Sequence, residues 1–263
     1  MNALLDALID GARYDGGNWR YAIDEGWMQG RTAFGGLSAA LALDAAMRDF
    51  PGEAPLRTAQ ISFVGPVGGQ ARVATRLLRQ SKSSRFASAD LSSDLGYGTS
   101  ATFTFMKRRD SHIDHRHIHA PDVSDPDALV SIPDHPMRPA FTRKFDMRPQ
   151  RGPGFGHGLD EGHILTWVRW VETPACDPHI ALLALADALP PAATTLFTAF
   201  GPLSSSTWIQ HFVSDCPHSD DGWWLLESRT RHVANGFSAQ SMYIWNSARE
   251  LVSVGGQGVA LYV

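Results

Sequence analysis

The chain has 263 residues, of which 43% are hydrophobic, 10% aromatic and 19% charged. This composition is typical of a globular protein, and the length allows one large domain or two fused units. The 23 basic and 27 acidic residues leave a net charge of −4, which gives no overall positive field for holding nucleic acid or an anionic membrane.

The N-terminus shows no features of a secretory leader, because it has no basic segment and carries Asp6 and Asp10 within its apolar stretch. The longest strongly apolar stretch, Ile180–Leu189, is far shorter than the ~18 residues of a membrane-spanning helix. Cys176 and Cys216 stand alone, without a zinc or disulfide pattern. We therefore expect a cytoplasmic protein with reduced thiols.

The first unit, residues 1–107, is predicted to hold one buried helix followed by an antiparallel sheet. After the motif Phe34-Gly35-Gly36, the run Leu37–Phe50 has helical apolar spacing, and its other faces are mostly alanine. Pro51-Gly52 is a typical end for such a helix. Segments typical of strands, parted by turn residues, follow at Leu56–Val64, Ala71–Leu78, Phe86–Ser93 and Thr99–Met106.

Residues 108–160 have a different texture and are predicted to form a linker or lid between two folded units. Five histidines lie between His112 and His135, and seven prolines lie between Pro121 and Pro153. Clusters of proline and polar residues of this kind disfavour regular helices and strands.

The second unit, residues 161–263, repeats the order of the first. Asp177-Pro178 is a typical start for a helix that runs to Leu189, and Pro190-Pro191 would end it. Phe86 and Phe237 align at an offset of 151 residues, which indicates a weak internal duplication. The pattern predicts an α+β protein with two similar halves and antiparallel sheets. Its strands are expected at Gly162–Glu172, Ser204–Val213, Trp223–Arg231, Gly236–Trp245 and Leu251–Tyr262.

Three short motifs, taken in their order, resemble those of TesB-like acyl-CoA thioesterases. They are Phe34-Gly35-Gly36 at the first helix, LLALADALPP at the second, and LVSVGGQGVALYV at the end of the chain. The resemblance covers nearly the whole chain and is weakest in the linker. It implies a double hotdog, in which each antiparallel sheet wraps around one long buried helix, and it implies a hydrolase of fatty-acid metabolism that needs no cofactor.

The same resemblance indicates the catalytic residues. The Asp that the family carries late in the second helix corresponds to Asp187, and the Gln of its last strand corresponds to Gln257. The hydroxyl residue of the family corresponds to Ser205, where relatives usually have Thr. Thr207 is the alternative, because Ser205 and Thr207 would share one face of a regular strand.

Asp187 is also a plausible general base on physical grounds. It lies among leucines and alanines in the last turn of its helix, so burial and the helix dipole should both raise its pKa toward neutrality. Without the resemblance, a buried Asp paired with an Arg such as Arg229 would be the simpler interpretation. Gln257 offers both a donor and an acceptor, which suits it to orienting a water molecule.

Substrate binding has weaker candidates. Gly35 and Gly36 precede the first helix, and Arg79, Lys82 and Arg85 cluster at a predicted turn where they could meet the phosphates of coenzyme A. A solvated hairpin is the simpler interpretation of those three charges.

Two further groups of polar residues have simpler interpretations than a functional site. Asp44 in the first helix is not expected to form a second site, because the ends of the two helices do not align it with Asp187. The histidines His112, His115, His117 and His119 could bind zinc, but a charged linker without a nearby cysteine favours solvated side chains. We therefore expect no metal.

The leading hypothesis is an acyl-CoA thioesterase that releases a free acid and coenzyme A, with Asp187, Ser205 and Gln257 around the attacking water. The alternative is a non-catalytic acyl-CoA or acyl-lipid binding module of the same fold, and a scaffold without affinity for acyl-CoA is the third. The expected partner is a small acyl-CoA molecule, not nucleic acid or a membrane. A homodimer is possible, and the two halves could bury their sheet faces against each other.

Overall fold

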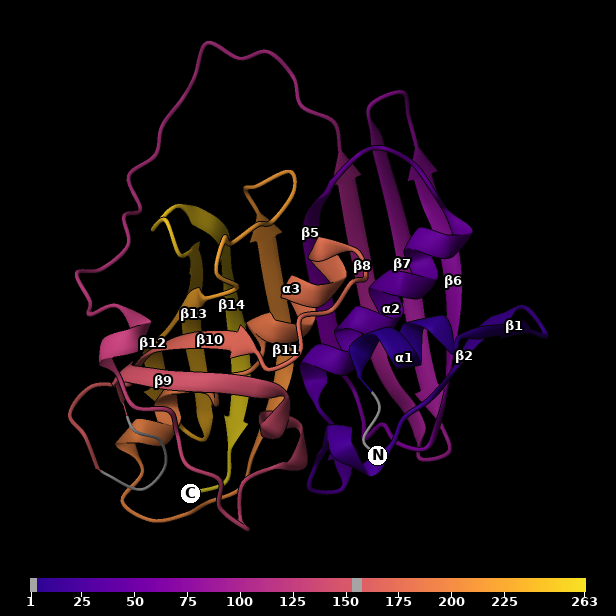
Figure 1. Cartoon of the computed structure of the whole chain (residues 1–263). Coiled ribbons are helices and arrows are strands. Elements are labelled where there is room, and N and C mark those ends of the chain that lie inside the picture. Colours follow the sequence, from indigo (N-terminus) through magenta and orange to yellow (C-terminus); the bar gives the residue numbers. More distant parts are fainter. Residues whose placement is uncertain (1–3, 153–157) are drawn as a thin grey trace.

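The two halves of the chain contribute to one continuous antiparallel sheet, whose strands run in the order β1-β2-β6-β7-β8-β5-β11-β14-β13-β12-β10-β9 (Figure 1). The computed structural model describes residues 4–152 and 158–263. The first half supplies β1 (Arg13–Asp15), β2 (Asn18–Ala22), β5 (Leu56–Phe63), β6 (Gln70–Gln80), β7 (Ser84–Ser93) and β8 (Gly96–Met106). The second half supplies β9 (Phe145–Arg151), β10 (His163–Trp170), β11 (Leu203–Phe212), β12 (Trp224–Ala234), β13 (Phe237–Asn246) and β14 (Leu251–Leu261).

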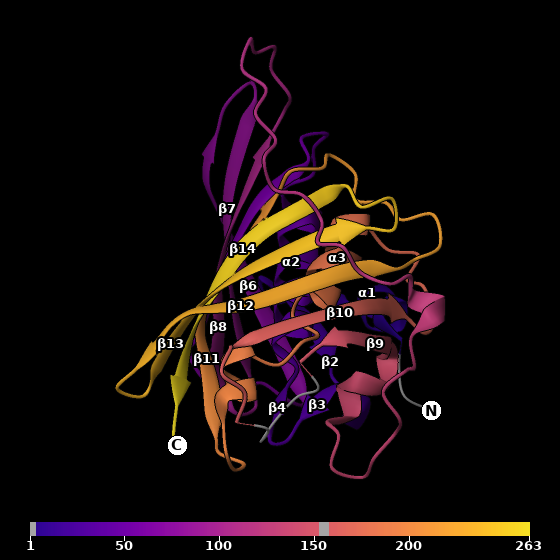
Figure 2. The same cartoon turned by 90° about the vertical axis from the view of Figure 1, so that its left-hand side faces the viewer.

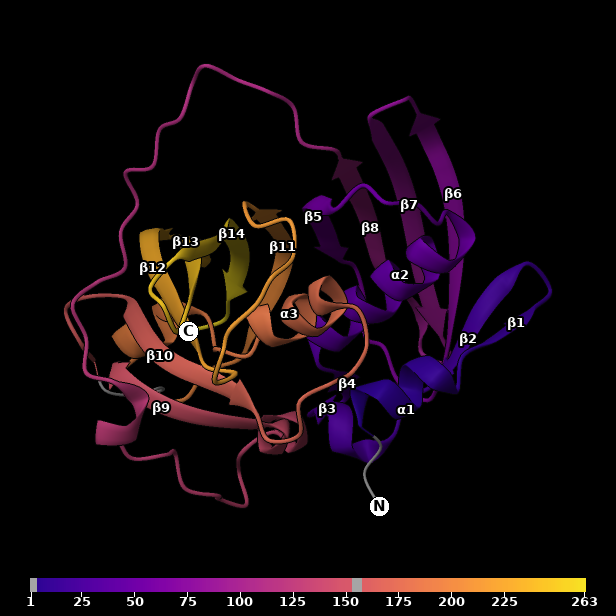
Figure 3. The same ribbon diagram turned by 45° about the horizontal axis from the view of Figure 1, so that its top comes forward.

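Two helices lie side by side on the inner face of this sheet. They are α2 (Gly35–Asp49) and α3 (Pro178–Ala186), and Figure 3 shows the strands of the second half curling around α3. Every residue of α2 from Gly36 to Ala46 is buried, which confirms the prediction of a helix covered on nearly all sides. At the start of α3, Asp177 accepts a hydrogen bond of 2.8 Å from the amide of His179, as its N-cap role predicts. The double hotdog expected from the sequence is therefore confirmed.

The halves join edge to edge. In the register of β5 with β11, Ile61 lies opposite Trp208 and Gln60 lies opposite Ile209. The expectation that the halves bury their sheet faces against each other is wrong, because this pairing satisfies both edge strands and merges the sheets into one.

The predicted linker, residues 108–160, divides into a strap, residues 108–144, and a strand. Residues 145–151 form β9, which pairs with β10 at the edge of the sheet, so this stretch belongs to the second half (Figure 2). Residues 153–157 lie outside the described part of the chain. The strap contributes Ile118, Ala120, Val123 and Leu129 to a cluster with Leu165, Trp167, Trp223, Leu225 and Trp245.

The strap lies on the outer face of the sheet. Ile164 and Val168 of β10 join the core with α3, whereas Leu165 and Trp167 point to the opposite side. Trp167 also donates a hydrogen bond of 3.0 Å from its indole nitrogen to the carbonyl of Ser124. The part of the strap packed here therefore covers the side away from α3, and it does not form a lid over that helix.

The remaining short elements complete the first half and the connections. They are α1 (Leu5–Asp10), β3 (Met28–Gln29), β4 (Thr32–Ala33) and the 3-10 turns η1 (Glu25–Trp27), η2 (Pro126–Ala128), η3 (Ala140–Lys144) and η4 (Ala192–Leu196). Within residues 4–152 and 158–263, no helix has both the length and the apolar character needed to cross a membrane.

Candidate active site

Asp187 lies where the two helices meet. It is the residue directly after α3, and the N-terminus of α2 faces its carboxylate. A Cβ on Gly35 would lie only 2.7 Å from Oδ2 of Asp187, and a Cβ on Gly36 would overlap the carbonyl oxygen of Ala184. The absence of side chains at Gly35 and Gly36 therefore lets α2 approach α3, and the site forms between the two halves of the chain.

The pKa of the Asp187 carboxyl is raised to about 7, because burial penalises its charged form. Hydrogen bonds from the Gln257 side chain and from the backbone amide of Gly36 act in the opposite direction. The direction of the shift agrees with the prediction. The sequence indicated only the negative end of α3 near Asp187, whereas the fold also brings the positive end of α2 to the same carboxylate.

A chain of buried amides reaches Asp187 from the sheet. Gln257 on β14 donates a hydrogen bond of 3.1 Å from Nε2 to Oδ1 of Asp187. Gln240 on β13 donates one of 3.1 Å to Oε1 of Gln257, and its own Oε1 accepts one of 2.8 Å from the amide of Ala192. The predicted pair of Asp187 and Gln257 is thus brought together.

Gln240 is a residue of the site that the sequence indicates only weakly. Along β13 the positions of Ser238, Gln240, Met242 and Ile244 alternate with more exposed ones and are all buried. A glutamine on the face that also carries Met242 and Ile244 needs a buried hydrogen-bond partner, and such a residue is a candidate for a functional network.

A β-bulge in β11 separates the two candidate hydroxyl residues. Ser205 lies opposite Val259 of β14, but Thr207 lies opposite Gly258, so Ser206 is an extra residue between them. Residues opposite each other share a face, and Val259 is two residues from Gln257 along β14. Ser205 therefore points to the same side of the sheet as Gln257, and Thr207 points to the other side.

The expectation that Ser205 and Thr207 share a face is wrong, because the bulge changes the alternation by one residue. Ser206 uses its hydroxyl within the sheet, since it donates a hydrogen bond of 3.0 Å to the carbonyl of Gly258. Of the two alternatives, only Ser205 lies on the face of the Asp187 site. A role for its hydroxyl in the reaction stays a prediction.

Aromatic side chains line the site on the side of β5. The ring of Phe63 lies 3.0 Å from the position that a Cβ of Gly35 would take. Phe63 also stacks on Trp208, with ring centroids 6.5 Å apart. Because Trp208 lies opposite Gln257 in the sheet register, this pair closes one flank of the site with apolar surface.

The basic turn lies at the other end of α2. Arg85 is buried, its guanidinium lies 4.2 Å from the centroid of the Phe105 ring, and it contacts Gly52 just beyond the helix. Arg79 and Lys82 are exposed near the same hairpin tip. A helix of this length spans about 20 Å, so the structure does not bring Arg79, Lys82 and Arg85 next to Asp187. Their contact with coenzyme A stays a prediction without support from this placement.

Asp44 is engaged in an internal network. Its Oδ2 accepts hydrogen bonds of 2.7 Å from the Tyr21 hydroxyl and of 2.7 Å from Nε of Arg48. This placement agrees with the expectation that Asp44 does not form a second site. Within the described residues, no group of three or more histidine, cysteine, aspartate or glutamate side chains is arranged to hold a metal ion.

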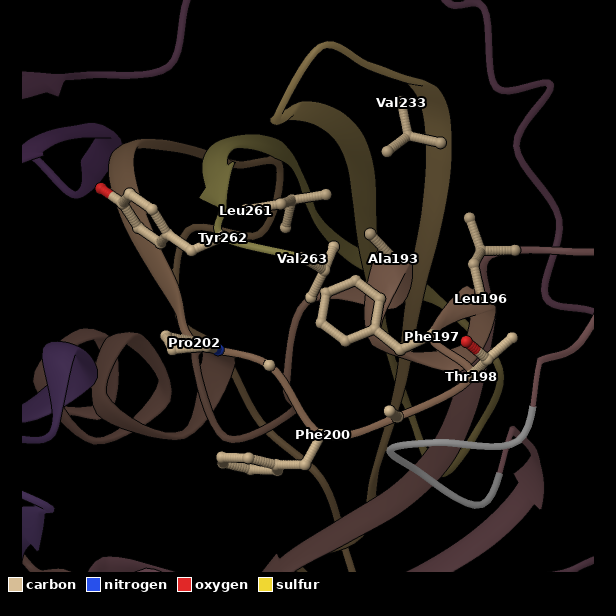
Figure 4. Close-up of a pocket in the computed structure, with 12 residues that line it drawn as sticks. Ala193, Leu196, Phe197, Thr198, Phe200, Pro202, Val233, Leu261, Tyr262 and Val263 are labelled. Carbon is tan, nitrogen blue, oxygen red and sulfur yellow. The ribbon is translucent and has the colours of Figure 1, made fainter.

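A groove of about 550 Å³ lies at the C-terminal end of β14, and none of Asp187, Ser205 and Gln257 is among the residues that line it (Figure 4). Its lining is mostly apolar and includes Leu196, Phe197, Phe200, Leu261 and Val263. Ala193, which lines the groove, directly follows Ala192, whose amide donates to Gln240. Leu261, which also lines it, lies on the same face of β14 as Gln257. The groove therefore continues the inner face of the sheet beyond the amide chain.

Comparison with known families decides the membership of the chain. The model of the acyl-CoA thioesterase N-terminal domain matches residues 23–106, and that of the acyl-CoA thioesterase C-terminal domain matches residues 120–261. The chain belongs to the acyl-CoA thioesterase family. Within this family member, Asp187, Ser205 and Gln257 all lie in the part matched by the C-terminal domain, whereas Gly35 and Gly36 lie in the N-terminal one.

Solved structures share the fold of this acyl-CoA thioesterase family member over its full length. A hotdog-fold protein of unknown function from Alicyclobacillus acidocaldarius has 21% identity and a TM-score of 0.88, covering 100% of this chain and 99% of its own. The TesB protein of Mycobacterium avium subspecies paratuberculosis has 16% identity and a TM-score of 0.78, with 98% of each chain covered. An acyl-CoA thioesterase II from Mycobacterium marinum has 16% identity and a TM-score of 0.77, with 98% of each covered. No protein of curated function matches the sequence.

Proposed function

We propose that this protein hydrolyses an acyl-CoA thioester to a free acid and coenzyme A, with Asp187 as the general base. The observation that carries the proposal is a carboxyl with a pKa of about 7, held by Gln257 and by the first turn of α2. A base of this pKa is partly ionised near neutral pH and can still accept a proton from water.

In the proposed reaction, the Asp187 carboxylate takes a proton from a water molecule while the water oxygen attacks the thioester carbonyl carbon. The carbonyl oxygen becomes an oxyanion. Amides of the first turn of α2 other than that of Gly36, which donates to Asp187, are suited to stabilise it, because a helix leaves its first amides without acceptors of its own. The carbon–sulfur bond then breaks, the thiolate of coenzyme A takes the proton from Asp187, and the acid is released. Ser205 and Gln257 would hold the water.

The groove beside η4 is the proposed place for the acyl chain. Its apolar lining suits a hydrocarbon, and its volume lies in the range of a few hundred Å³ that is usual for small-molecule pockets. Val233 lies on its rim. Replacing it by tryptophan should shift the preferred substrate toward shorter chains. A cytoplasmic location, expected from the sequence, remains part of the proposal, and a homodimer stays possible.

The test is release of coenzyme A, followed with a thiol reagent, across short, medium, long and aromatic acyl-CoA substrates. Saturable hydrolysis is expected, with Asp187→Asn lowering kcat by about 100-fold or more. Asp44→Asn is the matched control, because it removes another buried carboxylate that lies outside the site. If no substrate is hydrolysed while acyl-CoA binds tightly in a parallel titration, the protein is a binding module and the proposal is wrong.

A further inference from the structure

We propose that Gln240 is a positioning residue that fixes the orientation of the Gln257 amide, so that Gln257 always presents its NH2 group to Asp187. The inference rests on the proposed function, since it assigns Gln240 a part in preparing the same carboxylate. Gln240 lies on β13, its side chain is hydrogen-bonded to Gln257 and to the amide of Ala192, and it acts on Asp187 through Gln257.

The orientation is set at the far end of the chain of amides. The backbone N–H of Ala192 can only donate, so the atom of Gln240 that lies 2.8 Å from it must be the carbonyl oxygen Oε1. The NH2 group of Gln240 then faces Gln257, whose Oε1 accepts at 3.1 Å. The NH2 group of Gln257 is left for Oδ1 of Asp187 at 3.1 Å. One backbone amide therefore determines two side-chain orientations.

A reversed Gln257 would lose both of its hydrogen bonds. Its carbonyl oxygen would face Oδ1 of Asp187, and its NH2 group would face the NH2 group of Gln240. Both contacts would pair groups of the same kind in a buried place, because Gln240 and Gln257 are 6% and 7% exposed. An unsatisfied buried donor or acceptor is costly, so Gln240 disfavours this orientation as long as Ala192 holds it.

The fixed orientation gives the two oxygens of Asp187 different neighbours. Oδ1 accepts from the NH2 group of Gln257 at 3.1 Å. Oδ2 is the oxygen that faces Gly35 at the first turn of α2. Gln240 therefore keeps a donor on the Oδ1 side of the carboxylate that Asp187 uses as a base.

The experiment is a double-mutant cycle on kcat with Gln240→Met and Gln257→Met. Gln240→Met alone should lower kcat by about tenfold to a hundredfold, because a misoriented Gln257 no longer holds Asp187 and its water. In the Gln257→Met background, the same change should have no further effect on kcat. Ser238→Ala is the matched control, since Ser238 is buried on the same face of β13 and should leave kcat unchanged.

A purely structural role predicts something different. If Gln240 only ties β13 to η4, Gln240→Met should lower Tm equally in both backgrounds and should affect kcat equally with or without Gln257. Equal effects on kcat would therefore overturn the proposal. Gln240→Asn, which is too short to reach both partners, serves the same cycle if the methionine variant does not fold.

A readout without turnover separates this proposal from the proposed function. The carbon-13 resonance of the Asp187 carboxyl, followed against pH, should titrate at a higher pH in Gln240→Met than in wild type, because a donor that favours the charged form is no longer held in place. An unchanged titration would contradict the role of Gln240. If wild type hydrolyses no thioester, the proposed function fails, and the titration still tests the orientation of Gln257.

Discussion

Gly36 and Ala184 bring the two central helices into direct contact, since any side chain at Gly36 would overlap the carbonyl oxygen of Ala184. The same turn of α2 places its amide against Asp187. The approach of the helices and the electrostatics of the site therefore depend on one residue without a side chain. A residue in the first half of the chain thus shapes a carboxylate in the second half.

Gly36→Ala should lower both activity and stability. The added methyl group must push α2 away from α3, which costs about 1–3 kcal/mol of the free energy of unfolding and removes the amide from Asp187. Thermal unfolding and kcat, measured on the same preparation, check both effects. Gly68→Ala is the control, because a Cβ there meets only side-chain atoms at 3.3 Å or more. Unchanged kcat in Gly36→Ala would contradict the placement of the α2 amide.

The pH profile of hydrolysis should report Asp187. Since its pKa is about 7, kcat/KM is expected to rise with pH to a plateau, with a midpoint near 7. The residual kcat/KM of Asp187→Asn should not show this rise with pH. A wild-type midpoint near 4 would mean that the carboxyl is not desolvated in the working enzyme.

Asp187 should also make stability depend on pH. Its pKa is raised in the folded protein from an ordinary value of 3.8 to about 7, so the folded state holds an extra proton between these values. Its contribution to stability is therefore fully present below 3.8 and is lost as the pH rises through about 7. As the pH rises across this range, the free energy of unfolding of wild type should fall relative to that of Asp187→Asn. Parallel curves for the two proteins would contradict the raised pKa.

The bulge in β11 predicts different roles for two neighbouring hydroxyl residues. Ser205→Ala should lower kcat, because Ser205 lies on the face of Gln257, whereas Thr207→Ala should leave kcat unchanged. Measuring kcat and KM for both variants with the preferred substrate decides between them. A loss confined to Thr207→Ala would mean that the hydroxyl assigned from the family is the wrong one.

Asp44→Asn should change stability without changing the reaction. Its Oδ2 joins Tyr21 and Arg48, and replacing one charged partner of a buried network costs about 2 kcal/mol. Burial, together with the Asp44 charge, raises the pKa of Tyr21, which keeps that hydroxyl a donor. Denaturant unfolding measures the loss, and kcat below the transition should match wild type.

Much of the fold could be predicted from local patterns. The helix Gly35–Asp49 and the strands that follow it agree with the predicted segments to within a few residues, because apolar spacing and turn residues act over short stretches of chain. The second helix ends at Ala186, before the predicted Leu189, so Asp187 is the first residue after the helix and not part of its last turn.

Asp187 and Gln257 were assigned through motifs of the family and of this sequence, and the structure joins them by a hydrogen bond of 3.1 Å. Three other features had no local signal strong enough to predict them. They are the pairing of β5 with β11, the bulge at Ser206 and the anchoring of Gln240 by Ala192. Each depends on segments far apart in the chain.

The sequence by itself therefore determined which residues form buried helices, which form strands and which carboxylate lies in apolar surroundings. Only the tertiary structure decided that the first turn of α2 faces Asp187, that Ser205 rather than Thr207 shares the face of Gln257, and that a second glutamine stands behind the first. The physical reason is that periodicity reports the local faces of an element. Register, bulges and helix contacts are set by packing between elements that the chain brings together only on folding.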